Sequence, residues 1–256
     1  MIDPYEHSNS FITANGIQFH YALDGDASKP SLALVNMASA NLTNWEHSLP
    51  FLLTHFQILR FDIRGTGKSG WGGDDEFTFS QYADDLVAIM DALQIPKAFV
   101  LGVAYGARTV AQFGIRHPDR LTALALFDVA LTPPVEQTGQ RELGQQARQL
   151  LTEAGEPEYP TRKSWRFYEN RDAALSAHTA HEKEPDTSNS LSHLRVPVLV
   201  ACGRQDLNLQ EAQRIAKAIP GSEFKIMEMT GHGSPLFRPA YFAQFVTEFY
   251  QRNVNE

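Results

Sequence analysis

The sequence predicts an α/β fold in which a mainly parallel sheet is covered by helices on both faces. Two observations predict it. Short apolar runs typical of buried strands alternate along the chain with longer stretches whose apolar residues recur at helical spacing. This alternation stops between Leu131 and Leu194 and then resumes, as expected of an insertion. We therefore expect a core domain formed by residues 1–130 and 195–256, with a helical cap at 131–194 inserted after the sixth strand.

Eight short segments have the composition of strands. Asn15-Gly16 separates the first two, and this dipeptide is typical of the tight turn of a hairpin. Most later runs are almost entirely apolar, as strands buried on both faces of a parallel sheet are. The predicted strands are residues 11–14, 18–23, 31–35, 57–62, 98–101, 122–127, 196–202 and 223–229.

Four other segments of the core have helical periodicity. In the first of them, Tyr82, Leu86 and Ile89 fall on one face, with acidic residues between them. The predicted helices are residues 77–93, 107–116, 210–219 and 239–250. The inserted segment starts near Pro133-Pro134, is rich in Gln, Glu and Arg, and contains no convincing strand, so we expect it to be mostly helical.

Composition limits the kinds of partner and compartment. The chain has 256 residues, a formal net charge of −8 and a single cysteine, Cys202. The negative charge argues against nucleic acid or an anionic membrane as partner, and no apolar run reaches membrane-spanning length. One thiol excludes an internal disulfide and zinc sites built on several thiolates. Residues 1–6 lack the features of a signal peptide, so we expect a cytoplasmic protein. We expect no metal and no cofactor. The sequence favours no particular oligomeric state.

Residues 102–106 read Gly-Val-Ala-Tyr-Gly and stand between a predicted strand and a predicted helix. The pattern G-x-S-x-G in this context places a nucleophilic serine on a strained turn above a sheet. Ala104 stands where that serine would be, and a methyl group cannot attack a carbonyl carbon. The chain is therefore either a hydrolase disabled by one substitution or a natural relative that does not use the nucleophile.

Four further segments extend this pattern along the chain, and together they resemble the α/β-hydrolase superfamily over nearly the whole sequence. They are residues 36–39 ahead of Trp45, residues 62–69, Asp206 in Gly-Arg-Gln-Asp, and residues 231–233, which read Gly-His-Gly. The resemblance implies the α/β-hydrolase fold and a catalytic triad in the chain order nucleophile, acid, histidine. Ala104, Asp206 and His232 keep that order.

The residue types suit acyl transfer. His232 would accept a proton from the nucleophile and return it to the leaving group, while Asp206 would hold the imidazole in the correct tautomer. The Thr-Gly-His-Gly context favours this role over that of a loop histidine bonded to backbone. Asp128, after the sixth strand, is an alternative acid, because some family members place theirs there. The Gly-Arg-Gln-Asp context favours Asp206.

An oxyanion hole is expected from two backbone N–H groups, which would stabilise charge that develops in the transition state. The resemblance assigns one to Tyr105 and the other to the loop after the third strand, where Ala38 is the first candidate and Met37 the second. Asn36 replaces the histidine that many relatives have, a pattern similar to that of enol-lactone hydrolases. Asn36 therefore indicates a lactone substrate, or else it only fixes the loop.

Residues 65–70 match G-x-G-x-x-G but do not predict a phosphate site. A P-loop needs glycine at position 62, where this chain has Asp62. A dinucleotide-binding turn opens directly into a helix, whereas residues 71–75 read as a loop with two acids. The run matches the Arg-Gly-x-Gly-x-Ser turn of the family, with a structural role.

The inserted segment carries the basic residues Arg162, Lys163, Arg166 and Arg171 close to two aromatic side chains, Trp165 and Tyr168. These aromatic residues are candidates for contact with substrate, and the basic residues would then steer an anionic substrate over them. The alternative is a solvated helix face with the aromatic residues packed beneath it.

The leading functional hypothesis is a serine hydrolase of small carboxylic esters or lactones in which Ala104 replaces the nucleophile and leaves this form inactive. Alanine is the usual replacement when a nucleophile is removed. One alternative is a natural homologue that uses His232 as a general base without a nucleophile, as cofactor-free dioxygenases and lyases of this fold do. Another is a non-catalytic ligand-binding protein, although a pure binder has no need of both Asp206 and His232.

Overall fold

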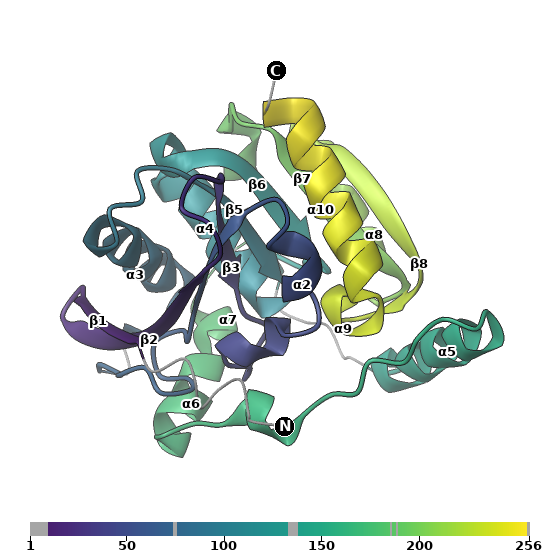
Figure 1. Ribbon diagram of the computed structural model, residues 1–256, viewed down its shortest axis with the longest axis horizontal. Helices are drawn as coiled ribbons and strands as arrows, with labels where there is room; N and C mark the ends of the chain where they lie inside the picture. Colours follow the sequence, from purple (N-terminus) through teal and green to yellow (C-terminus); the bar gives the residue numbers. More distant parts are fainter. Residues whose placement is uncertain (1–9, 74–75, 133–137, 185, 188, 255–256) are drawn as a thin grey trace.

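The computed structural model describes residues 10–73, 76–132, 138–184, 186–187 and 189–254, and its centre is one eight-stranded sheet (Figure 1). The strands are β1 (Ser10–Ala14), β2 (Ile17–Asp24), β3 (Ser31–Val35), β4 (Gln57–Phe61), β5 (Ala98–Val103), β6 (Leu121–Phe127), β7 (Val198–Gln205) and β8 (Glu223–Gly231). Their order in the sheet is β1-β2-β4-β3-β5-β6-β7-β8. β1, β2 and β4 pair antiparallel, and all later neighbours pair parallel. The predicted fold class, a mainly parallel eight-stranded sheet, is confirmed.

The first hairpin turns at the predicted dipeptide. Asn15 has a φ of +45° and Gly16 a φ of +82°. Positive φ at both central residues is what the tightest hairpin turn requires, which is why Asn-Gly is favoured there. The hairpin brings β1 to the edge of the sheet, far from the site described below.

Helices cover both faces of the sheet. They are α2 (Leu49–Leu52), α3 (Phe79–Ala92), α4 (Tyr105–Arg116), α8 (Leu209–Ala218) and α10 (Pro239–Val254). α2 and α10 lie on one face, and α3, α4 and α8 lie on the other. Leu32 and Leu34 of β3 belong to the apolar core under α2 and α10, whereas Ala33 and Val35 belong to the core on the opposite face. Because successive strand residues point to opposite faces, one buried strand contributes to both cores.

Residues 131–194 contain helices and short 3₁₀ turns in their described parts, and no strand. The elements are α5 (Gln140–Glu153), η4 (Lys163–Arg166), α6 (Arg171–His178), α7 (Ala180–Lys183) and η5 (Ser190–His193). α5 packs against β8 at the edge of the sheet, and Figure 1 shows α6 apart from it. The division into core and cap stays a prediction.

Element boundaries differ from the predicted ones by a few residues. α3 starts at Phe79 rather than at 77, because the Thr78 side chain accepts a hydrogen bond from the N–H of Gln81 at 3.0 Å and caps the helix. α4 starts at Tyr105 rather than at 107, directly after Ala104. The predicted features at residues 1–6, Asp74-Asp75 and Pro133-Pro134 lie outside the described residues.

Candidate active site

Ala104 occupies a sharp turn between β5 and α4. Its φ of +53° and ψ of −111° lie outside the regions that a residue with a Cβ normally adopts. Such a conformation costs of order 1–3 kcal/mol and persists only where the surroundings impose it. Here the N–H of Ala104 donates to the carbonyl of Phe127 at 2.8 Å, and its own carbonyl accepts from the N–H of Ala107 at 3.1 Å. The turn is therefore strained, as the G-x-S-x-G pattern predicts, and its role as a nucleophile elbow stays a prediction.

The two glycines of the elbow are required by close backbone contacts. A Cβ on Gly102 would overlap the backbone of Gly106, and a Cβ on Gly106 would overlap the carbonyls of Val35 and Asn36. The first contact allows α4 to begin directly above β5. The second brings α4 against the end of β3, so that residues 36–40 lie beside the elbow.

His232 and Asp206 form a hydrogen-bonded pair. His232 Nδ1 lies 2.9 Å from Asp206 Oδ2, and the two residues directly follow β8 and β7. The Asp206 side chain is completely buried, whereas 32% of the His232 side chain is exposed. Burial acts to lower the pKa of His232, but the hydrogen bond and charge of Asp206, together with the charge of Asp128, outweigh it and raise this pKa above its ordinary value. A histidine in this environment is a strengthened proton acceptor.

Asp128, the alternative acid, is engaged elsewhere. It is fully buried and accepts hydrogen bonds from the N–H of Gly203 at 3.1 Å, the N–H of Gly233 at 3.0 Å and the N–H and hydroxyl of Ser234 at 2.6 and 2.7 Å. Burial and the neighbouring Asp206 charge raise the pKa of Asp128. Asp128 thus anchors the loop that carries His232.

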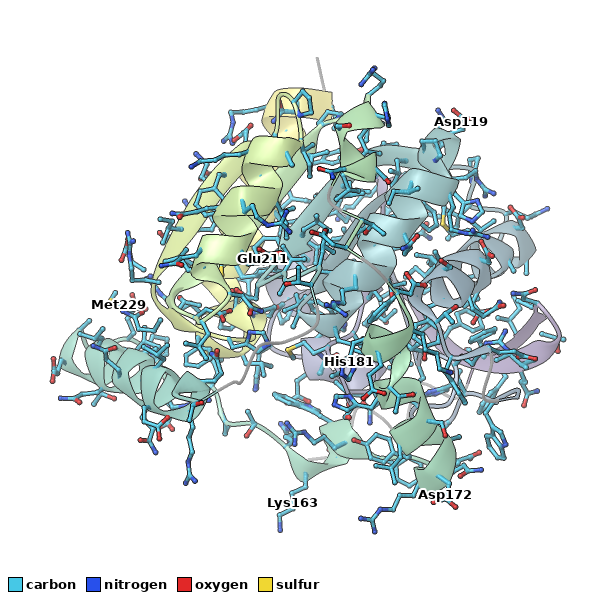
Figure 2. The ribbon with its side chains drawn as sticks, turned by 180° about the vertical axis from the view of Figure 1, so that it is seen from behind. Asp119, Lys163, Asp172, His181, Glu211 and Met229 are labelled. Atoms are coloured by element: carbon cyan, nitrogen blue, oxygen red, sulfur yellow. The ribbon has the colours of Figure 1, made fainter. Side chains whose placement is uncertain are left out.

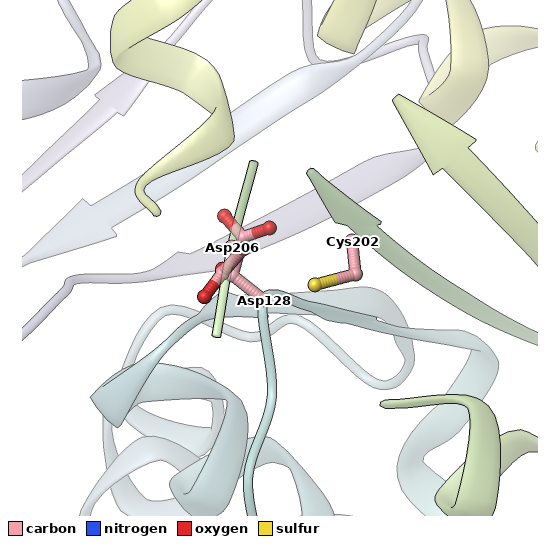
Figure 3. A group of neighbouring side chains, drawn as sticks. All are labelled: Asp128, Cys202 and Asp206. Carbon is pink, nitrogen blue, oxygen red and sulfur yellow. The ribbon is translucent and has the colours of Figure 1, made fainter. Parts of the chain in front are cut away.

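Asp128, Cys202 and Asp206 come together beneath this loop (Figure 3), and one ligand atom from each lies within 4.8 Å of the others. Three such groups could in principle hold a metal ion. Burial raises the pKa of the Cys202 thiol, so it stays protonated. Asp128 already accepts four hydrogen bonds and Asp206 is bonded to His232. These residues therefore fit a packed hydrogen-bond network rather than a metal site.

A cavity of about 920 Å³ opens above the elbow and brings most of the predicted site residues together. Ala104, Tyr105, His232, Ala38 and Met37 all line it. Tyr105 is the first residue of α4, so its N–H has no acceptor within the helix and is available to an oxyanion. The roles of Ala38 or Met37 as the second donor stay a prediction.

Asn36 lies next to the cavity but outside its lining. Its amide Nδ2 donates to the carbonyl of Phe61 at 2.8 Å, and its Oδ1 accepts from Trp45 Nε1 at 2.7 Å. The side chain is completely buried. These contacts support the alternative in which Asn36 fixes the loop after β3.

The inserted segment contributes one wall of the cavity. Trp165, Arg162, Lys163 and Arg166 line it, whereas Arg171 and Tyr168 do not. The Tyr168 hydroxyl instead donates to the carbonyl of Ser39 at 2.7 Å, and η1 (Leu42–Trp45) is preceded by Asn41, which is bonded to the backbone of η4. The segment is therefore tied to the loop after β3 from outside the cavity.

Among the lining residues that the sequence analysis missed, three have side chains that can carry a charge: Arg108, His178 and His181. The signal for Arg108 was its position in the sequence, only four residues after Ala104. The two histidines belong to α6 and α7. No local sequence pattern predicts that these helices lie beside the cavity.

The glycine-rich run at residues 65–70 is a structural turn. Asp62 accepts hydrogen bonds from the N–H of Lys68 at 2.9 Å and from the N–H of Leu42 at 2.7 Å. Gly67 lies so close to this carboxylate that a Cβ there would overlap it. The carboxylate occupies the place where a phosphate-binding loop would hold its ligand.

Comparison with known proteins agrees with this architecture. Residues 34–151 match the family model described as alpha/beta hydrolase fold. The chain has the α/β-hydrolase fold. It is 24% identical to 3-oxoadipate enol-lactonase 2 of Acinetobacter baylyi, over 97% of this chain and 99% of that one. It is 26% identical to a putative carbamate hydrolase, RutD, of Caulobacter sp. strain K31, over 93% and 96% of the two chains.

Solved structures of α/β-hydrolases are similar over most of the chain. The enol-lactonase from Burkholderia xenovorans LB400 superposes with a TM-score of 0.78 at 25% identity, over 94% of this chain and all of that one. A thermophilic esterase from Thermogutta terrifontis gives a TM-score of 0.75 at 22% identity, which bears on the fold alone. In this protein, no helix among the residues that the structure describes is both long and apolar enough to cross a bilayer.

Proposed function

We propose that this chain is built as a serine hydrolase of small carboxylic esters or lactones and that Ala104, at the nucleophile position, leaves this form with at most residual turnover. The observation that carries the proposal is the His232–Asp206 pair, at 2.9 Å, beside a strained elbow whose geometry is intact. The lactonase and hydrolase names of several relatives support the substrate class.

The chemistry follows from the positions of the groups. A serine Oγ at position 104 would attack the acyl carbon while His232 Nε2 accepts its proton, because Nδ1 is bonded to Asp206. The N–H groups of Tyr105 and Ala38 would stabilise the oxyanion. His232 would then return the proton to the leaving oxygen. In the second half of the reaction, water would attack the acyl carbon, and His232 would accept its proton and pass it to the serine oxygen as the acid is released.

A second candidate function uses His232 as a general base without a covalent intermediate. Two features favour it: the His232–Asp206 pair and the cavity of about 920 Å³ are both present although position 104 is alanine. The substrate would then be one that reacts after loss of an acidic proton.

Ala104→Ser distinguishes the two candidates. The substitution adds one oxygen to a turn that already has the required backbone geometry, so we expect an active hydrolase that a fluorophosphonate labels covalently. The measurement is hydrolysis of a panel of p-nitrophenyl esters and small lactones by both forms, with labelling detected by mass spectrometry. Ala104→Gly is the matched control and should neither label nor hydrolyse. If the serine form does neither while the unchanged protein turns over a substrate of its own, the nucleophile-free function takes the place of our proposal.

A further inference from the structure

The charge of the cavity lining is opposite to that of the molecule. The chain has 30 acidic and 22 basic residues, for a net charge of −8. Its cavity is lined by Arg108, Arg162, Lys163 and Arg166, together with three histidines, and no aspartate or glutamate is among the described lining residues. A positive pocket in an acidic protein attracts anions.

The basic residues differ in how much they contribute to this attraction. Lys163 and Arg166 are exposed at the rim, and Figure 2 shows Lys163 at the outer edge of the molecule. Arg162 is ion-paired with Glu46. Water and salt screen such exposed charges, so they are worth little for binding. Arg108 is only 7% exposed and is the one whose charge acts at short range.

Arg108 stands apart from the other arginines that are buried in the described structure. Arg60 donates to Asp24 at 2.6 Å, and Arg64 forms a two-bond contact with Asp85 at 2.7 and 2.8 Å. Arg108 makes no ion pair with any described carboxylate. Burial lowers its pKa, and the charges of Glu184, Asp186 and Glu211, which act in the opposite direction, do not outweigh the effect of burial.

The guanidinium is instead held by backbone carbonyls. Nε donates to Ala130 at 2.7 Å, and Nη2 donates to Thr132. Carbonyl oxygens orient the group but carry no net charge to neutralise it. The nearest carboxylates are engaged elsewhere: Glu184 accepts from Gln112 and Ser80, while Glu211 and Asp186 pair with Arg214.

We propose that Arg108 is the binding site for a carboxylate carried by the substrate, so that the ester or lactone taken by this cavity is a monoanion. The inference rests on the proposed function for the reacting group and adds the charge of the substrate. One buried guanidinium neutralises one negative charge, which fits a carboxylate, whereas a phosphate dianion would leave a surplus charge buried. Arginine also presents the planar donor fork that matches a carboxylate.

Arg108 and Ala104 lie close together along the chain, which favours a short substrate. Ala104 directly precedes α4, and Arg108 is the fourth residue of that helix. Both residues line the same cavity. We therefore choose a half-ester of glutarate, a short dicarboxylic acid, as the probe.

The test compares two nearly isosteric probes on the protein as it is, with Ala104 in place. Monobenzyl glutarate carries the carboxylate, and benzyl methyl glutarate carries a neutral ester at the same position. Calorimetry in low and in high salt should give at least a tenfold tighter Kd for the anion, since charge-assisted hydrogen bonds contribute that much. Most of the preference should survive in high salt, because Arg108 is buried. Equal affinity for the two probes, or no measurable binding of the anion, overturns the proposal.

Two further measurements assign the preference to Arg108. Arg108→Gln should bind the neutral diester as before and lose most of the preference for the anion, whereas the matched control Arg171→Gln, which is exposed and outside the cavity lining, should retain it. In the unsubstituted protein, which needs no variant to fold, the NMR resonance of Arg108 Nε–H should shift with monobenzyl glutarate and not with the diester. A Gln variant that weakens both probes equally, or a resonance that responds equally to both, would make Arg108 a purely structural residue.

These outcomes are separable from failure of the proposed function. Binding to the Ala104 form requires no turnover, so a preference for the anion stands even if Ala104→Ser proves inactive. Conversely, an active serine form that hydrolyses anionic and neutral p-nitrophenyl esters equally well would retain the hydrolase function and exclude the carboxylate site.

Discussion

Ala104 keeps a backbone conformation that alanine by itself disfavours. With a φ of +53°, the residue stores strain of order 1–3 kcal/mol, which the hydrogen bonds of the turn and the fit of the two glycines maintain. The strained turn places the side chain of residue 104 in the lining of the cavity that His232 also lines. At the scale of single residues, our proposal therefore attributes the inactivity of this form to one missing oxygen atom at position 104.

The pH dependence of an Ala104→Ser form tests the His232–Asp206 pair. A general base must be neutral, and Asp206 raises the pKa of His232 above its ordinary value of 6.5. We therefore expect kcat/KM to fall as pH drops, with a midpoint above 6.5. Asp206→Asn removes the hydrogen bond and the charge that raise this pKa, so the midpoint should move to lower pH and kcat should fall by several orders of magnitude.

Asp84→Asn provides the control for this titration, because Asp84 pairs with Arg116 and His117 away from the cavity. It should leave the profile unchanged. A midpoint that stays in place in Asp206→Asn would mean that Asp206 does not set the pKa of the base.

At the scale of elements, the site is assembled where parallel strands end. The loops after β3, β5, β7 and β8 contribute Ala38, Ala104, Asp206 and His232, and these loops meet because parallel strands present their carboxyl ends at one edge of the sheet. α4 begins at the same edge, so its first N–H groups point toward the cavity.

Ala38→Pro tests the second oxyanion donor. Proline has no N–H, so in the Ala104→Ser background we expect kcat to fall by roughly 10²–10³-fold, as when one donor of an oxyanion hole is removed. Ala38→Gly retains the N–H and is the matched control, which should keep most of the activity. The measurement is steady-state hydrolysis of a p-nitrophenyl ester. Full activity of the proline form would assign the donor to another residue, with Met37 the next candidate.

At the scale of the whole molecule, buried polar groups join segments that the sheet alone would not hold. Asp62 receives the N–H of Leu42 and that of Lys68 and is 2.7 Å from His20 Nδ1. It therefore connects β2, the loop that leads to Trp45 and the glycine-rich turn at the end of β4. The Asp62 carboxylate is completely buried, so its removal would leave each of these donors without a hydrogen-bond acceptor.

Asp62→Ala should lower the free energy of unfolding by about 3 kcal/mol, because several buried donors would be left without an acceptor. Urea denaturation followed by circular dichroism measures this loss. Asp119→Ala is the control: Asp119 is exposed, at the periphery of the molecule in Figure 2, and its loss should leave the unfolding midpoint unchanged. A midpoint that is equally unaffected in Asp62→Ala would show that the surrounding segments are held by packing alone.

The sequence alone determined the order of the elements and predicted where along the chain the candidate elbow, acid and histidine stand. Those features depend on local patterns: an Asn-Gly turn, helical spacing in α3, and Gly-x-Ala-x-Gly after a strand. Helix starts were less predictable, since Thr78 caps α3 through a contact that composition does not reveal. α4 likewise starts earlier than its periodicity indicates, because the elbow turn leads directly into it.

Only the tertiary structure decided which groups meet. Asp128 and Asp206 are both acids after strands, and their difference comes from contacts across long stretches of chain: Asp128 binds the backbone of Ser234, while Asp206 meets His232. The bonds of Asn36 and the carbonyl partner of Arg108 Nε also depend on segments brought together by folding. The physical reason is that burial and hydrogen-bond partners are properties of the packed molecule, whereas the sequence records only neighbours along the chain.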